Sequence, residues 1–473
     1  MSPTAVVWGL VVKLEYNMYC KKNIVIFSAL VLILVISGCA GIRQNDIPAP
    51  SHLPGITRDM NRPGFWISRH PHPDDILMKP EGINVFNRHV EKDLEFTRNI
   101  PDLEPIYDGK TLVRSMEKRL VKQAFKKLFL KNGRQADKAF YHDMAQQMNI
   151  KNIPDDIVVR YGVVTTYTDQ RTLPTRQGMY TNPHDLEFDR LQNNGLDLGT
   201  VLAVLHDSAD GRWQYVLSPL SAGWVEAKKV AGCSRDQARA FDRPDSFVVV
   251  TGAKADIYLD SRLTQYQDHA RMGTRLGMAG FADDVVQVNI PGRNAHGTLQ
   301  IHKGYMRAKK VSNGFLPYTP RNIITQAFEC LNAPYGWGGM HGEQDCSRFI
   351  NSVFATVGLR LPRNSSAQAK VGVSIGIFDE QTDSLEKLEI IHDKAEVGST
   401  LLHLNGHIML YLGEEDGHPH VIHSLWGYGD AGKNAHQIRV VNGVRVTPLS
   451  LGSGSMRGSL LDRLKTMPSI AMP

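Results

Sequence analysis

Two residues near the C-terminal end, Cys346 and His407, are of types that cooperate in nucleophilic catalysis. Asp345 is a good helix N-cap, and apolar residues recur at helical spacing from Phe349 to Val357, so Cys346 is expected in the first turn of a helix. There the helix dipole and unpaired N–H groups favour a thiolate, with a pKa below the usual ~8.5, and can hold an oxyanion. A lone helical cysteine is more often a small buried apolar residue, but here a Gly-rich loop precedes it and histidines follow. The pattern predicts a cysteine nucleophile.

A strand pattern surrounds the candidate base. Apolar residues alternate with His407 over positions 407–412, and a second short strand is expected over about residues 420–425. With the hairpin centred near Glu415, His407 would lie directly opposite His423, with Cβ atoms roughly 4.5–5.5 Å apart. We therefore expect His407 to act as general base and acid, and His423 to orient it through the second ring nitrogen.

A metal site is the strongest alternative chemistry for this segment. Zinc binds histidines and cysteines in a four-ligand shell. Six histidines lie close together here: His392, His403, His407, His418, His420 and His423. Positions 403 and 407 flank a Gly-containing turn and not a helix, so they are not presented as a helical pair. We expect no metal and no other cofactor, and we interpret the segment containing His70 and His72 as a prolyl loop.

Length and composition limit the folds that can position these residues. A chain of 473 residues with 42% hydrophobic residues is too long for one compact core, and suggests roughly three or four globular domains. The net charge of +6 is spread along the chain without a basic block, which argues against nucleic acid as a partner. The expected fold class is multidomain α+β.

Residues 1–39 have the organisation of an export signal. Lys21 and Lys22 precede an apolar run that ends in small residues before Cys39. The ending Ile-Ser-Gly-Cys resembles a bacterial lipobox, which implies lipidation of Cys39 and attachment to a membrane through the lipid. Met18 would then be the start, and the lack of an acidic residue after the cysteine implies outer-membrane retention, facing the periplasm, in a Gram-negative source. An uncleaved single-pass anchor is the alternative, but the run is short for a span. We expect the body of the protein outside the cytoplasm.

Residues 40–160 are expected to contain a tether and a small helical domain. The stretch up to about residue 65 is rich in Pro, Gly and polar residues. From about residue 83 to 150 the periodicity is helical. The apolar stripe consists of Leu112, Met116, Leu120, Ala124 and Leu128, flanked by Val113, Val121, Phe125 and Phe129.

Residues 161–243 and 244–315 show the short alternating segments typical of small β-barrels. The first range contains a strand, an Asp-Gly turn, a second strand and a closing strand around Trp224. It resembles a bacterial SH3 domain. The second range ends in a comparable strand around Tyr305, and we interpret it as a second, divergent SH3-like barrel.

Residues 316–473 form the last predicted domain. The segments PYGWGG, DCS, GHIMLYLG and VIHS occur in the order and spacing of the NlpC-type cysteine peptidases, bacterial enzymes that cut peptidoglycan stem peptides. The resemblance covers about residues 316–465, and the lipobox and SH3-like regions fit the same family. It implies a papain-like catalytic domain in which Cys346 is the nucleophile, His407 the general base and acid, and His423 the orienting third member.

The resemblance also implies roles around the cleft. Tyr335 matches a tyrosine that lines the family's cleft, and Asp345 and Ser347 match residues that in some members contact a free amine of the substrate. Members with bacterial SH3 domains commonly cut between γ-D-glutamate and the following diamino acid, in stem peptides with a free N-terminal L-alanine. The implied partners are therefore peptidoglycan stem peptides or muropeptides.

Further substrate contacts are expected from the first barrel. A loop carrying Glu187 or Asp189 could cap the cleft and pair with an amine, and Trp224 could stack on substrate, although solvated surface and barrel core are the commoner places for such residues. Arg348 and Met409 depart from the family, in which a glycine and a small residue are usual. Arg348 is expected to point outward from its helix or to narrow the cleft.

Two other functions are compatible with these features. A non-catalytic wall-binding lipoprotein would have the same domains, but loss of catalysis would not be expected to spare the cysteine and both histidines. An acyltransferase on the same fold would pass the acyl group to an amine or lipid instead of water. The exported body contains Cys233, Cys330 and Cys346, so at least one thiol is expected to be free.

Overall fold

The computed structural model describes residues 46–48, 52–431 and 437–471. Residues 47–473 form one compact unit. The predicted export signal, Cys39 and the first part of the tether lie outside the described residues. In the part of the chain that the structure describes, no helix is long and apolar enough to cross a membrane.

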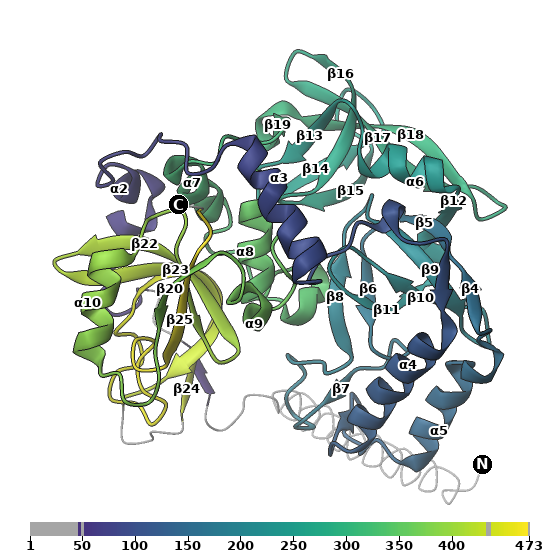
Figure 1. Cartoon of the computed structure of the whole chain (residues 1–473), viewed down its shortest axis with the longest axis horizontal. Helices are drawn as coiled ribbons and strands as arrows, with labels where there is room; N and C mark the ends of the chain where they lie inside the picture. Colours follow the sequence, from purple (N-terminus) through teal and green to yellow (C-terminus); the bar gives the residue numbers. More distant parts are fainter. Residues whose placement is uncertain (1–45, 49–51, 432–436, 472–473) are drawn as a thin grey trace, which may run out of the picture. The chain divides into compact units, whose positions relative to one another are not determined.

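The helices are short and are distributed along the whole described chain (Figure 1). They are α2 (Pro63–Ile67), α3 (Pro80–Arg88), α4 (Gly109–Ala124), α5 (Lys138–Gln147), α6 (Arg235–Asp242), α7 (Pro320–Glu329), α8 (Cys346–Ala355), α9 (Ser365–Gln368) and α10 (Ser384–Lys394). The strands form three large sheets and two strand pairs, β2 (Ile106–Asp108) with β4 (Asp156–Val158) and β3 (Phe129–Leu130) with β7 (Met179–Tyr180).

An antiparallel sheet organises the C-terminal part of the chain. Its strands are β20 (Val373–Ile377), β21 (Leu401–Leu404), β22 (His407–Glu415), β23 (His418–Gly429), β24 (Ile438–Pro448) and β25 (Leu464–Ser469). They lie in the order β24-β23-β22-β21-β25-β20, and the short β1 (Asp46–Pro48) lies within the predicted tether. Helices α7 and α8 contribute to the core on one face of this sheet, and α10 contributes to the core on the other face.

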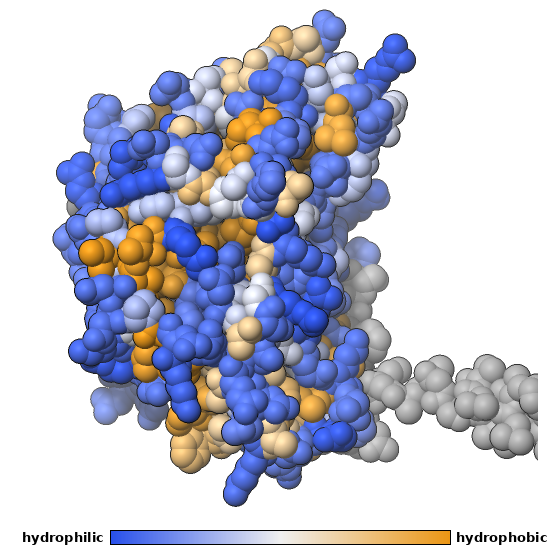
Figure 2. Space-filling view, turned by 90° about the vertical axis from the view of Figure 1, so that its right-hand side faces the viewer, coloured by the Kyte–Doolittle hydropathy of each residue, from blue (hydrophilic) through white to orange (hydrophobic). Residues whose placement is uncertain are grey.

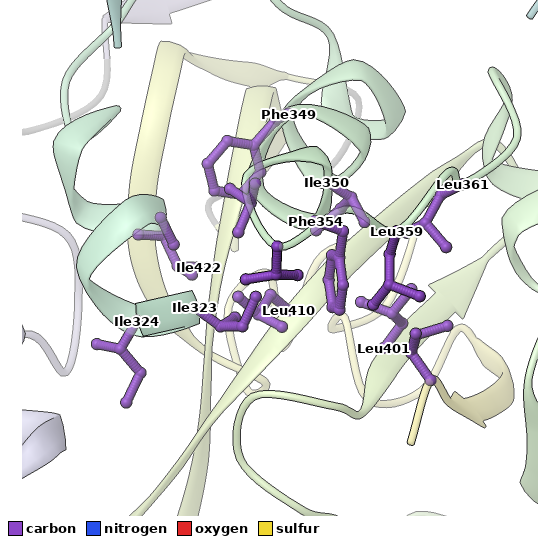
Figure 3. Packing of buried hydrophobic residues seen from close by; sticks show 14 of the residues in the cluster. Ile323, Ile324, Phe349, Ile350, Phe354, Leu359, Leu361, Leu401, Leu410 and Ile422 are labelled. Atoms are coloured by element: carbon purple, nitrogen blue, oxygen red, sulfur yellow. The ribbon is translucent and has the colours of Figure 1, made fainter. Parts of the chain in front are cut away.

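Helix α8 is the centre of the larger core. Its residues Phe349, Ile350 and Phe354 are fully buried and pack with Leu410 of β22 and Ile422 of β23 (Figure 3). Burying each such side chain contributes roughly 1.5–3 kcal/mol. Asp345 caps the helix, with its side chain accepting the N–H of Arg348, which confirms the predicted helix and its start at the cysteine.

The first predicted barrel is an antiparallel sheet with the strand order β12-β5-β9-β10-β11-β6-β8. Its strands are β5 (Arg160–Val164), β6 (Thr168–Arg171), β8 (Gln192–Leu196), β9 (Val201–Asp207), β10 (Trp213–Leu217), β11 (Ala222–Glu226) and β12 (Val230–Cys233). The predicted turn lies between β9 and β10, where Gly211 has a φ of 67°, a left-handed conformation that glycine adopts without steric cost. The predicted closing strand around Trp224 is β11.

The second β unit has the order β15-β14-β18-β17-β16-β13-β19 and a core of its own. Its strands are β13 (Phe247–Val250), β14 (Lys254–Tyr258), β15 (Tyr266–Arg271), β16 (Arg275–Ala282), β17 (Val285–Arg293), β18 (Leu299–Arg307) and β19 (Val311–Asn313). In both units an Ala-Lys-Lys turn of 3-10 helix, at 227–229 and at 308–310, joins the last two strands. This shared ending supports the predicted internal repeat, whereas the SH3-like assignment of the second unit stays a prediction.

The region before the barrels differs from the prediction in three ways. Helix α4 ends at Ala124, so Val121 and Phe125 are exposed at its end and do not belong to a continuous apolar stripe. Leu112 and Met116 of α4 pack into the core of the first barrel, because a few short amphipathic helices cannot enclose a core of their own. The described part of the predicted tether is also packed, since Met60 is 6% exposed and belongs to the core around α8, as does Trp66 of α2 directly after the tether.

Candidate active site

Cys346 is the first residue of α8 and lies next to the start of β22. Its sulfur lies 4.0 Å from the carbonyl oxygen of Gly406, the residue before His407. The backbone N–H groups of Ile408 and Ser347 also act on the sulfur. The thiol is thus held between the beginning of the helix and the beginning of the strand that carries the predicted base.

The thiol is almost fully buried, which changes its expected ionisation. Cys346 is only 6% exposed, and burial, followed by the charge of Asp345, raises the pKa of the thiol to about 12. The helix terminus was expected to lower this pKa, but the N–H groups that do so are outweighed by the loss of hydration of a charged sulfur. Burial likewise lowers the pKa of His407 to about 3. The resting pair is therefore a neutral thiol and a neutral imidazole.

His407 and His423 are joined by a hydrogen bond of 2.6 Å between Nε2 of His407 and Nδ1 of His423. The predicted pairing of the two residues was right, but the register was wrong. Leu410 pairs with Ile422, and a bulge follows Tyr411, so that continuation of the register places Met409 opposite His423. The two histidines are therefore diagonal neighbours, which are still within reach of ring side chains.

A third residue, Thr447 of β24, extends this contact. Its Oγ1 lies 3.0 Å from Nε2 of His423, and both side chains are fully buried. If Nδ1 of His407 is to accept a proton from the thiol, its Nε2 must carry the hydrogen and donate it to Nδ1 of His423. Nε2 of His423 then carries a hydrogen and donates to Thr447. No motif marked Thr447 in the sequence, because only strand pairing brings it to the histidine.

Asp345 has a different environment from the one implied by the resemblance. Its carboxylate accepts hydrogen bonds from Arg363 at 2.7 and 3.1 Å, from Ser347 Oγ at 3.0 Å and from the N–H of Gly338 at 3.1 Å. Burial opposes its charge, but Arg363 outweighs burial and keeps the pKa of Asp345 below its ordinary value. Arg363 also donates to Asn194 Oδ1 of the first barrel at 2.6 Å. Asp345 and Ser347 therefore belong to a buried, charge-balanced network beside the nucleophile.

Arg348 is not directed to solvent, contrary to the prediction. It lies 2.6 Å from Asp197 of the first barrel, and Asp197 is also bound by Arg271 of the second β unit at 2.6 Å. All three side chains are buried, with 12, 8 and 1% exposed. The carboxylate of Asp197 thus joins the two β units to α8. Its contact on the helix is Arg348, two residues after Cys346.

Aromatic side chains from two parts of the chain meet near the nucleophile. Tyr335 lies near enough to Cys346 for the two groups to interact electrostatically, and burial is the main reason that its pKa is raised. The ring of Phe188, from a loop of the first barrel, lies 5.3 Å from the rings of both Trp337 and Trp426 and 6.4 Å from that of Tyr335. Edge-on contacts of this kind contribute about 0.5–1.5 kcal/mol beyond area burial. The barrel loop therefore reaches the site, as predicted, but through Phe188.

Of the other predicted barrel contacts, those of Asp189 and Trp224 are not formed, and that of Glu187 stays a prediction. Glu187 is exposed. Asp189 is paired with Arg171 at 2.6 Å inside the barrel. Trp224 is fully buried in the barrel core, where its ring packs against Tyr215 at 5.5 Å, so the prediction that it binds substrate is wrong. Its alternation in β11 directs it to the barrel interior.

The histidines considered as zinc ligands are spread over several environments. His392 contacts Glu414 at 3.2 Å and His403 contacts Thr466 at 3.4 Å, while His420 packs on Trp66. Within the described ranges, no group of three His, Cys, Asp or Glu side chains is placed to hold a metal ion. Cys233, Cys330 and Cys346 are free thiols.

Comparison with known families agrees with this geometry. Residues 332–430 match the NlpC/P60 family, and residues 179–226 match an SH3 domain of the SH3b1 type. These matches confirm the predicted family of the C-terminal domain and the SH3 character of the first barrel.

Two bacterial relatives have the name gamma-D-glutamyl-L-lysine dipeptidyl-peptidase. The protein from Bacillus cereus is 24% identical over 193 residues, which cover 41% of this chain and 54% of the relative. The protein from Bacillus subtilis is 32% identical over 96 residues, which cover 20% of this chain and 30% of the relative. The chain thus matches about half or less of the length of each relative.

A solved structure shares the fold over nearly the whole chain. An NlpC/P60 endopeptidase from Photobacterium damselae subsp. piscicida superposes with a TM-score of 0.69, covering 90% of this chain and 96% of its own, at 21% sequence identity. The arrangement of catalytic sheet, barrels and preceding helices is therefore a known one.

Proposed function

Because residues 332–430 form an NlpC/P60 family domain, we propose that this chain is a cysteine peptidase that hydrolyses peptidoglycan stem peptides. The observation that carries the proposal is the convergence of a thiol at a helix start with a pair of hydrogen-bonded histidines, at 2.6 Å, on the neighbouring strands. Each of these groups has a place in amide hydrolysis.

The proposed reaction begins from the neutral pair. Nδ1 of His407 accepts the proton of the Cys346 thiol as the sulfur attacks the carbonyl carbon of the amide. The N–H groups at the start of α8 stabilise the resulting oxyanion. The proton on His407 then passes to the leaving amine, which breaks the C–N bond and leaves a thioester that water hydrolyses with His407 again as the base. His423 stabilises the transient imidazolium by accepting the Nε2 hydrogen.

We propose the bond between γ-D-glutamate and the following diamino acid as the one cut, in stem peptides with a free N-terminal L-alanine. The names of the two Bacillus relatives support this bond. Asp345 is not the acid that we propose to pair with the free amine, because Arg363 already balances its charge. Asp169 of β6 is a better acid for this role, since its carboxylate accepts from the neutral groups Gln192 Nε2 at 2.8 Å and Tyr167 OH at 3.2 Å.

Gln192 connects Asp169 to the catalytic domain. Its Nε2 also lies 3.2 Å from the carbonyl oxygen of Gly338, in the loop that precedes Cys346. The N–H of Gly338 is bound by Asp345. Asp169 is half-buried, and these contacts include no cationic group. An ammonium group of the substrate would therefore stabilise the charge of this carboxylate.

The test is hydrolysis of the tripeptide L-Ala-γ-D-Glu-diamino acid and of its N-acetylated form, followed by mass spectrometry. We expect cleavage of the free tripeptide after γ-D-glutamate, at least tenfold faster than of the acetylated form, and none with Cys346→Ala. Asp169→Asn should reduce the preference for the free amine, and Asp256→Asn, on the exposed face of β14, should keep it. Full activity of Cys346→Ala would refute the nucleophile, and an unchanged preference in Asp169→Asn would refute only the amine contact.

We also propose that the chain is exported and anchored by lipid on Cys39, facing the periplasm in a Gram-negative cell. The lipobox-like residues before Cys39 support this. Metabolic labelling with an alkyne fatty acid should modify the wild type and not Cys39→Ala. Equal labelling of both proteins would contradict the anchor.

A further inference from the structure

A hollow of about 230 Å³ lies behind the catalytic helix, where the two β units and α8 meet. In Figure 1, α8 lies between the C-terminal sheet and the barrels. Arg348, Asn351 and Ala355 of α8 line the hollow, whereas Cys346, His407 and His423 are not among its lining residues. It is therefore distinct from the catalytic group itself, although Asn194, Asp197 and Arg348, described above, also line it.

Positive charge predominates in this hollow. Four arginines line it, Arg98, Arg275, Arg348 and Arg360, against two carboxylates, Asp197 and Asp242. Asp197 is bound by Arg271 and Arg348, and Asp242 lies 3.5 Å from Arg243 and 4.0 Å from Arg275. Among the described residues, no carboxylate forms an ion pair with Arg98 or Arg360. Two half-buried arginines thus line the cavity without a counter-ion among the described residues.

Two further observations indicate that this charge is not satisfied within the protein. Nε of Arg348 is buried and has no hydrogen-bond partner in the part of the chain described. Arg360 also lies near enough to Arg275 to lower the pKa of that guanidinium, adding to the effect of burial. Like charges held together in a partly buried place are stabilised by an anion between them.

The remaining wall is apolar. Leu198 and Met272 are 1% exposed, and Phe241 lies beside them in the lining. Guanidinium groups bind carboxylates in a bidentate manner, and an apolar wall adds affinity for a hydrocarbon part. The volume lies below that of most pockets for drug-sized ligands, about 300–1,000 Å³, so the ligand is small.

We propose that this hollow is a binding site for a small organic carboxylate with an apolar part, held by Arg98, Arg275 and Arg360. The proposal does not depend on the peptidase activity, since none of these residues belongs to the catalytic group.

Benzoate and its neutral analogue benzamide are suitable probes, with the full chain, by isothermal titration and by the shift in melting temperature. We expect benzoate to bind saturably, at least tenfold more tightly than benzamide, and to raise the melting temperature. Arg360→Gln and Arg98→Gln should each weaken benzoate at least fivefold. Arg262→Gln removes the same charge from an exposed loop of the second β unit, and should leave binding unchanged.

Several results would overturn the proposal. Equal affinity for benzoate and benzamide would show that the cavity recognises only the apolar part of the ligand. Tight binding of inorganic phosphate, with no binding of benzoate, would exclude an organic carboxylate as the ligand. Loss of benzoate binding in Cys346→Ala would place the ligand in the catalytic site instead. Absence of benzoate binding to the wild type would also refute the site. The comparison of benzoate with benzamide uses the wild-type chain, so it tests the proposal even if an arginine variant fails to fold.

Discussion

Nε2 of His407 lies 2.6 Å from Nδ1 of His423, and this contact decides which ring nitrogen of His407 is left for Cys346. A histidine that donates through Nε2 keeps the lone pair of Nδ1 for accepting a proton. For catalysis His407 must therefore donate through Nε2 to His423, and His423 through its own Nε2 to Thr447, whose Oγ1 lies 3.0 Å away.

Replacing Thr447 should impair catalysis without affecting substrate binding. Thr447→Val keeps the side-chain shape but removes the acceptor, so His423 can lose its favoured tautomer. We expect kcat to fall by roughly tenfold to a hundredfold, a part of the 10²–10⁴-fold that general acid–base catalysis supplies, with little change in KM. Thr447→Ser should restore most of the rate. Equal loss in both variants would point to packing, and an unchanged kcat in Thr447→Val would exclude the positioning role.

The burial of Cys346 predicts an unusual pH dependence of alkylation. With a thiol pKa of about 12, the thiolate fraction rises about tenfold per pH unit through the neutral and mildly alkaline range. The rate of iodoacetamide labelling at Cys346, followed by peptide mass spectrometry, should therefore still be rising at pH 10. Mapping by peptide separates this thiol from Cys233 and Cys330. A plateau reached below pH 9 would show a thiolate stabilised by the helix terminus.

The shared carboxylate of Asp197 should be important for stability. Asp197→Asn leaves the guanidinium groups of Arg271 and Arg348 buried without their counter-charge. Removing one partner of a buried ion pair costs about 3–5 kcal/mol. Chemical denaturation should show a loss of this size, against less than about 0.5 kcal/mol for the exposed Asp245→Asn. A small effect in Asp197→Asn would mean that water replaces the lost charge in this junction.

The buried histidines predict that stability rises with pH in the acidic range. The pKa of His407 is about 3 in the folded chain, and that of His423 is also well below the ordinary 6.5, in both cases mainly because of burial. Between these values the unfolded chain binds protons that the folded chain does not. This contribution to stability is therefore present above about pH 6.5 and is lost as the pH falls, toward about 3 in the case of His407, by up to ~1.4 kcal/mol per pH unit for each site.

His407→Gln and His423→Gln are the variants that check this pH dependence. The free energy of unfolding, measured by denaturant between pH 4 and 7, should depend less steeply on pH in each of them than in the wild type. His296→Gln, in an exposed loop, serves as the control and should keep the wild-type slope. The same slope in all four proteins would show that both histidines are protonated in the folded chain.

The sequence by itself determined the local elements of the catalytic domain and the identity of its reactive groups. The Asp345 cap and the apolar residues after it define α8 and its first residue, because capping and periodicity act within a few residues. Alternation around His407 similarly identified its strand, and the motifs identified the family.

Only the tertiary structure decided the environment of those groups. The sharing of Asp197 between Arg271 and Arg348, the pairing of Asp345 with Arg363, and the packing of Phe188 on Trp426 join residues far apart in the chain. Glu415 pairs with His418, so the hairpin turns at Asp416 and Gly417 and not at Glu415, and this small difference was enough to change the expected register of the histidines. The pKa of the Cys346 thiol was also decided by the tertiary structure. The helix start acts locally on the thiol, whereas burial depends on all the elements packed around the sulfur.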